Sequence, residues 1–85
     1  MDLYEEIEKN FPKIEKFLTE RTLSEFLQTA PDDLGKYNVG LGTMIRLKLL
    51  RPENVLYKKF VQHGYSDRDT MTMIIIREFL KYLLR

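Results

Sequence analysis

The chain lacks the residues on which several common classes of small protein depend. Among its 85 residues there is no cysteine and only one histidine. A disulfide-stapled scaffold is therefore excluded, and so is a zinc site built from cysteine and histidine ligands. The absence of cysteine fits a reducing compartment. We expect a cytoplasmic protein with no metal ion and no cofactor.

Long apolar runs are missing as well. The most apolar stretch, residues 71–84, is too short to span a bilayer and contains Arg77, Glu78 and Lys81. The first residues are acidic and amphipathic, without the basic region and apolar core of a signal peptide. We therefore expect no membrane partner.

What is present favours a single helical domain over residues 1–85. Apolar residues make up 44% of the chain and charged residues 32%, a composition typical of globular proteins. A helical apolar stripe runs from Leu3 to Leu18, and Pro12 inside it predicts a break near Asn10, followed by a second helix that ends about Glu20. Thr22 and Glu25 form a capping-box pattern that would open a third helix.

Further helices are predicted from Thr43 as a cap to residue 50, over residues 53–62, and over about 14 residues after Asp67. In the helix at 53–62, Val55, Leu56, Phe60 and Val61 are expected to face inward, and Gly64 suits the left-handed position after its end. The predicted fold class is all-α: a compact single domain of five or six short helices packed around a hydrophobic C-terminal helix.

Three of the four glycines, Gly35, Gly40 and Gly42, fall within eight residues. We predict that Gly40 or Gly42 has a positive φ. Arg46 should then lie near this turn, bonded to Asp33 or to exposed carbonyls. Backbone amides before the next helix could instead bind an anion, although the spacing of a P-loop is missing. A tight turn and close helix packing explain the glycines more simply.

No set of catalytic residues is found. The adjacent acids Asp32 and Asp33 lack the further ligands that a magnesium or calcium site needs. We expect them to be solvated or to cap a helix. His63 lies close in sequence to Ser66 and Asp67, but adjacency along one turn does not bring a nucleophile, a base and an oxyanion hole together. The dipole and carbonyls of a helix C-terminus explain this histidine. We do not expect an enzyme.

Charge is divided unevenly along the chain. Residues 1–33 contain nine acids and four bases, net −5, whereas residues 34–85 contain four acids and ten bases, net +6. The two halves either pair across the fold or leave the basic half to face an anionic partner. The densest basic segment, interleaved with Tyr57 and Phe60, would suit phosphate contacts and base stacking; it contains Arg46, Lys48, Arg51, Lys58 and Lys59.

The chain resembles a small uncharacterised bacterial family, a domain of unknown function, over residues 32–82. The features that carry the resemblance are Gly40-Leu41-Gly42 followed by Ile45-Arg46, and Asp69 with Met71-Thr72 and Ile74-Ile75. Asp33-Leu34-Gly35 and the set Leu56, Phe60 and Gly64 also belong to it, while the basic residues 48–51 depart from it. The resemblance implies a shared helical fold and a shared surface around residues 40–46. It implies no activity, and residues 1–31 lie outside it.

The function we predict is a small non-enzymatic domain that binds another protein. Its candidate surface comprises Gly40, Gly42, Arg46, Lys48, Arg51, Lys58 and Lys59. The alternative is a nucleic-acid-associated protein that uses residues 46–59. The last helix has a second apolar stripe, Met73, Ile76, Leu80 and Leu84, which is either buried by the N-terminal helices or paired in a homodimer. We prefer the monomer.

Overall fold

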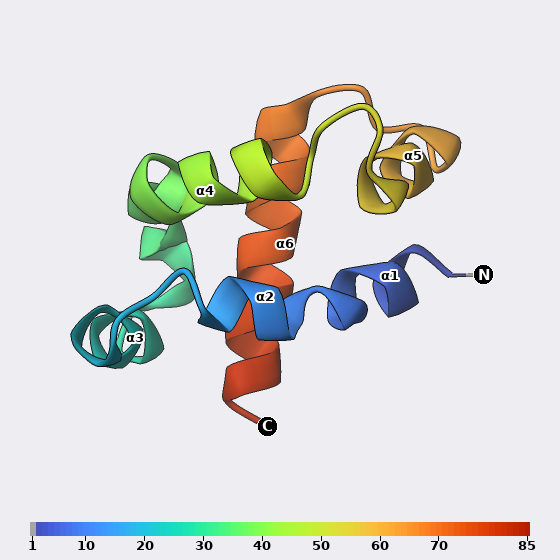
Figure 1. The fold of residues 1–85 in the computed structure, drawn as a ribbon. Coiled ribbons are helices and arrows are strands. Elements are labelled where there is room, and N and C mark those ends of the chain that lie inside the picture. The colour runs from blue at the N-terminus through green and yellow to red at the C-terminus, as the bar shows by residue number, and fades with distance from the viewer. Residues whose placement is uncertain (1) are drawn as a thin grey trace.

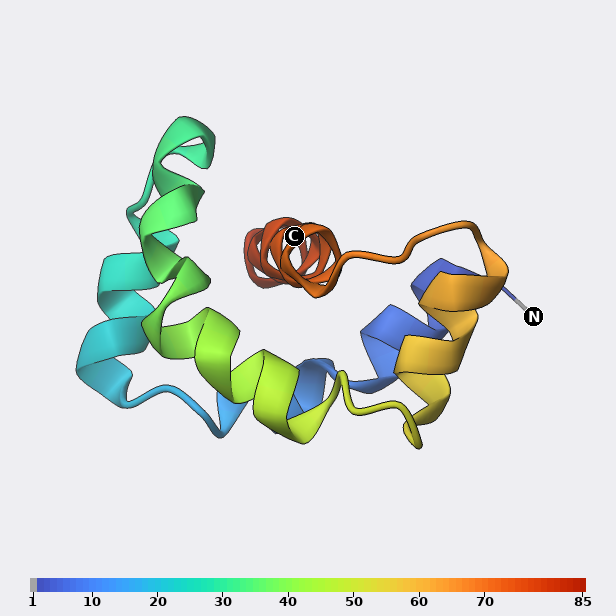
Figure 2. The same ribbon diagram turned by 90° about the horizontal axis from the view of Figure 1, so that it is seen from above.

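The longest helix of the chain, α6 (Arg68–Leu83), runs through the middle of the fold. The computed structural model describes residues 2–85, and in it the other helices surround α6 on three sides (Figures 1 and 2). α6 contacts α1, α3, α4 and the 3₁₀ helix η1. The predicted all-α fold around a hydrophobic C-terminal helix is confirmed.

Residues 2–85 form six α-helices and one 3₁₀ helix, with no strand in this part of the chain. In chain order these are α1 (Leu3–Lys9), α2 (Phe11–Glu15), α3 (Glu20–Leu27), η1 (Pro31–Asn38), α4 (Gly40–Lys48), α5 (Val55–Gln62) and α6. Within the same residues, no helix is both long enough and apolar enough to cross a membrane.

The predicted break in the N-terminal stripe is present at Asn10, which ends α1 and precedes α2. The buried Asn10 donates from Nδ2 to the carbonyl of Glu6 at 2.8 Å, and so closes the last turn of α1. Pro12 lies in the first turn of α2, where its missing amide costs no hydrogen bond. The predicted end near Glu20 is wrong, because α2 stops at Glu15.

The cap of α3 is Thr19 rather than Thr22. The Thr19 hydroxyl accepts from the amide of Thr22 at 3.1 Å, and the Thr22 hydroxyl accepts from the amide of Thr19 at 2.8 Å. Thr22 thus takes the role that the sequence pattern gave to Glu25, and α3 begins one turn earlier than predicted.

Aromatic side chains join α2 and α3 to α6 in the core. The ring of Phe79 lies 5.7 Å from that of Phe11 and 5.6 Å from that of Phe26, and all three side chains are buried. Full burial of a phenylalanine stabilises a fold by roughly 1.5–3 kcal/mol. This cluster therefore holds the acidic N-terminal half against the central helix.

The second apolar stripe of α6 is divided between the core and the surface. Ile76 and Leu80 are buried within the single chain, Met73 is partly buried, and Leu84 is 62% exposed. The four residues therefore do not form one exposed face, in agreement with the central-helix alternative. Elsewhere on α6, Arg77 and Lys81 are exposed and lie one turn apart.

α5 packs against α1 and buries fewer of its residues than predicted. Leu56 and Phe60 face the core, but Val55 and Val61 are 55% and 47% exposed, so their predicted inward orientation is wrong. Leu56 and Phe60, four residues apart, are the buried residues of this short helix, and Tyr57 is partly buried against the core. His63 donates from Nδ1 to the carbonyl of Lys59 at 2.8 Å, and Gly64 has the predicted positive φ, +91°.

Candidate functional site

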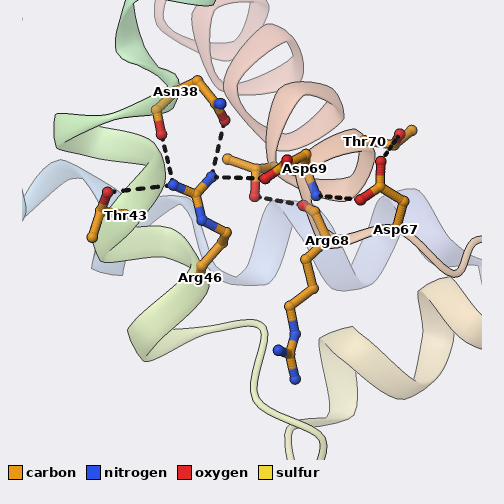
Figure 3. Close-up of polar contacts among 8 residues, drawn as sticks. Asn38, Thr43, Arg46, Asp67, Arg68, Asp69 and Thr70 are labelled. Carbon is orange, nitrogen blue, oxygen red and sulfur yellow. Dashed lines mark hydrogen bonds and ion pairs between the residues drawn. The ribbon is translucent and has the colours of Figure 1, made fainter.

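Arg46 joins the C-terminal end of η1 to the first turn of α6 (Figure 3). Its Nη1 donates to Oδ1 of Asn38 at 2.9 Å, and its Nη2 donates to the Asn38 carbonyl at 2.8 Å and to Thr43 Oγ1 at 3.3 Å. Nη1 also lies 3.6 Å from Oδ1 of Asp69. The predicted contact with a backbone carbonyl is confirmed; the predicted contact with Asp33 is absent, because Asn38 takes that place.

The first turn of α6 presents two aspartates with different tasks. Asp67 is the N-cap: its carboxylate accepts from the amide of Asp69 at 3.1 Å and from the hydroxyl of Thr70 at 2.9 Å. The Thr70 hydroxyl, followed by the Asp69 amide, holds the pKa of Asp67 below its usual value. Asp69 turns toward Arg46, so this helix start is anchored by both a cap and an ion pair.

Gly42 allows α4 to lie close to its neighbours. A Cβ atom placed on Gly42 would lie 3.1 Å from the carbonyl oxygen of Tyr37 and 3.1 Å from Cγ2 of Thr72. Gly42 is buried, whereas Gly40 is exposed and a Cβ there would meet nothing within 4 Å. The close-packing explanation of the glycines is therefore confirmed at Gly42.

The backbone at these glycines differs from the prediction. Neither Gly40 nor Gly42 has a positive φ; among residues 2–85 only Gly64 has one. Thr43 is not the cap of α4, because the helix already begins at Gly40, directly after η1 and Val39. Both glycines lie inside α4, whose helical backbone has a negative φ at every residue.

Asn38 is the residue that sequence reasoning missed. It supplies the two closest acceptors of the Arg46 guanidinium, at 2.9 and 2.8 Å, from a position eight residues earlier in the chain. Together with Thr43 and Asp69, these acceptors place the guanidinium of Arg46 in contact with η1, α4 and α6. The geometry makes Arg46 a structural clamp.

The other basic candidates are spread over three segments. Lys48 ends α4, Arg51 lies in the following loop 3.5 Å from Glu53, and Lys58 and Lys59 belong to α5. The aromatic residues that interleave them are not free to stack on bases. Phe60 is fully buried, and the ring of Tyr57 lies 5.3 Å from the guanidinium carbon of Arg68.

Arg46 and its partners Asn38, Thr43 and Asp69 form what we call the Arg46 cluster. An apolar groove lies beside this cluster, between the segment that joins α2 to α3, the end of η1 and the start of α4. Its volume is about 300 Å³. The residues that line it carry no charge, and they are Phe17, Leu18, Thr19, Thr22, Tyr37, Gly40, Leu41 and Met44. Of the sequence-predicted surface, only Gly40 lines this groove.

The two oppositely charged halves of the chain are scarcely paired. Within residues 2–85, the one ion pair that joins residues 1–33 to residues 34–85 is between Glu8 and Arg85, at 3.3 Å. The remaining ion pairs lie within one half or the other, so most of the charge asymmetry stays on the surface.

The chain belongs to the family described as Domain of unknown function (DUF6794), whose model matches residues 5–83. The match includes residues 5–31, which lie outside the sequence resemblance over residues 32–82, so α1 to α3 are part of the family's domain. Comparisons with curated proteins and with solved structures find no match.

Proposed function

We propose that this DUF6794 domain is a small non-enzymatic protein-interaction domain, and that it receives apolar side chains of a partner protein in the groove between α3, η1 and α4. The observation that carries the proposal is the uncharged lining of this groove. Apolar surface gathered in a hollow typically marks an interaction site.

The chemistry of the lining favours an apolar protein segment as the occupant. The rim hydroxyls of Thr19 and Thr22 are bonded to each other and to the backbone of α3, so they offer little to a charged or strongly polar ligand. Met44 is partly exposed at the edge, and methionine adapts its shape to irregular apolar partners. A volume of about 300 Å³ is enough for one or two large side chains.

A position-specific crosslink tests the proposal. A photocrosslinking amino acid is placed at Met44 or, as a control, at Ser24, which is exposed on α3 and does not line the groove. Irradiation in the native host should give a discrete protein adduct from position 44 that is absent from position 24. No adduct at 44, or the same adducts at both positions, would contradict the proposal.

The same experiment distinguishes protein binding in the groove from the alternative, nucleic-acid association through residues 46–59. A protein adduct formed directly in the groove should persist when nuclease is added before irradiation. An adduct that disappears with nuclease, together with binding that weakens steeply with salt, would favour the nucleic-acid alternative.

A further inference from the structure

The outward side of α5 combines apolar and basic residues with no acid, all of them exposed except Lys59, which is partly buried. We name this surface the α5 face, and it consists of Val55, Lys58, Lys59, Val61 and Gln62. At helical spacing Lys58 falls between the two valines. Both valines are about half exposed, at 55% and 47%. A short helix that buries only Leu56 and Phe60 thus presents an unpartnered amphipathic surface.

The positive charge of this surface is not neutralised by the chain. Lys58 and Lys59 take part in none of the ion pairs that residues 2–85 form. Arg68 adds a third cation, because its side chain leaves the Arg46 cluster and reaches toward α5, over the ring of Tyr57 (Figure 3). Tyr57 lies one turn before Val61, so this cation flanks the α5 face.

Two acids close to the α5 face already have basic neighbours. Glu53, two residues before α5, lies 3.5 Å from Arg51. Glu6 of α1 lies 3.7 Å from Lys9 and lines a hollow of about 170 Å³ that Lys13 and Val55 also line. This hollow gives the face a recess beside one of its exposed valines.

We infer that the α5 face binds an acidic, apolar segment of a partner protein, at a site separate from the groove of the proposed function. Carboxylates would meet Lys58, Lys59 and Arg68, while apolar side chains of the same segment would cover Val55 and Val61. Such charge complementarity directs association and orientation, and apolar burial supplies affinity. The segment therefore needs both kinds of side chain in alternation.

Two other anionic partners fit this surface less well. Nucleic acid binding without sequence preference uses exposed aromatic platforms, and Phe60 is buried while Tyr57 is already covered by Arg68. Helices that lie on anionic membranes carry large apolar side chains such as Trp, Phe and Leu opposite their lysines, whereas the α5 face offers two valines.

Selection from a random peptide library tests the inference. Peptides of about twelve residues displayed on phage are selected on the wild-type chain, and the selected peptides are then measured on single variants. We expect sequences rich in Asp and Glu that repeat Val, Leu, Ile or Phe at helical spacing. At low salt, their affinity for the Lys58→Glu variant and for the Val61→Asp variant should be about tenfold lower than for the wild-type chain.

Arg21→Glu is the matched control. It makes the same charge change on α3, which lies at the end of the molecule opposite α5 (Figure 1), and it should leave the affinity unchanged. A peptide that binds the groove instead should lose affinity for the Met44→Glu variant and keep its affinity for the Lys58→Glu variant. Circular dichroism of each variant confirms that the fold is kept.

Several outcomes would overturn the inference. One is that no acidic peptides are enriched, and another is that Lys58→Glu and Arg21→Glu bind the selected peptides equally. A third is that only a 20-nucleotide single-stranded DNA or phosphatidylglycerol vesicles bind in a Lys58-dependent way. Light scattering that shows Lys58-dependent dimers without peptide binding would also overturn it, in favour of a second copy of this chain.

Discussion

Arg46 donates to both the side-chain and the backbone oxygen of Asn38, at 2.9 and 2.8 Å. This pairing ties the beginning of α4 to the end of η1, and the ion pair with Asp69 extends it to α6. The glycine-rich segment that stands out in the sequence is therefore held together by its own side chains. The groove that we propose as the binding site is lined in part by Gly40 and Leu41 of the same segment.

Replacement of Arg46 should lower the stability of the fold. Arg46→Met leaves both Asn38 acceptors without their donor, and we expect a loss of about 1–2 kcal/mol in the free energy of unfolding, measured in urea. Arg46→Lys should cost nearly as much, because an ammonium cannot donate as a planar fork.

Asp69→Asn is the matched comparison for Arg46. The Asp69 carboxylate is 69% exposed and lies 3.6 Å from the guanidinium, so its charge adds at most about 1 kcal/mol. A loss larger for Asp69→Asn than for Arg46→Lys would contradict the importance we give to Asn38.

Alanine at the glycines should separate close packing from conformational freedom. Gly42→Ala should cost about 1 kcal/mol or more, because the new Cβ meets a backbone oxygen at 3.1 Å. Gly40→Ala should be neutral or stabilising, since the space around it is open and alanine favours helix. Thermal melts of the two variants give the comparison; equal losses would show that the carbonyl of Tyr37 is not the constraint.

Charge inside the core should unfold the chain, while the same change at the end of α6 should not. Ile76→Glu and Leu80→Glu place a carboxylate among buried side chains, and we expect loss of the helical circular dichroism signal. Leu84→Glu should be tolerated, because Leu84 is 62% exposed. Folded, soluble monomers of Ile76→Glu or Leu80→Glu, together with a wild-type dimer in light scattering, would instead support self-association through this stripe.

The N-cap of α6 should make stability depend on acid pH. The folded pKa of Asp67 is lowered from its ordinary value of 3.8 by the Thr70 hydroxyl and the Asp69 amide. Its contribution is therefore present above pH 3.8 and is lost as the pH falls below that value, through the folded pKa. Asp67→Asn should flatten this part of the pH–stability curve. An unchanged curve would show that the capping carboxylate does not titrate differently on folding.

The sequence was most informative where local chemistry decides the structure. The break before Pro12, the left-handed Gly64 and the central α6 follow from proline sterics, glycine freedom and apolar periodicity, and all three are present. The capping-box pattern located α3 but assigned the cap three residues late, because Thr19 and Thr22 form an equivalent pair.

The sequence was least informative where distant residues meet. Gly42 is required by Thr72 and by the carbonyl of Tyr37, and no local pattern connects α4 with α6. Arg46 was expected to bond to Asp33 or to exposed carbonyls. The carbonyl is that of Asn38, and the amide side chain of Asn38 takes the place expected of Asp33. The exposed valines of α5 were misassigned because periodicity does not state how much of a stripe a neighbour covers.

The central claim, that Arg46 holds the fold while the groove binds the partner, is tested most directly by one comparison. Met44→Glu and Arg46→Met are each measured for thermal stability and, below the melting temperature, for co-purification of the protein crosslinked at position 44. The account predicts that Met44→Glu keeps its melting temperature and loses the partner, whereas Arg46→Met melts at a lower temperature and retains the partner. An Arg46→Met chain that keeps wild-type stability and loses the partner would contradict it.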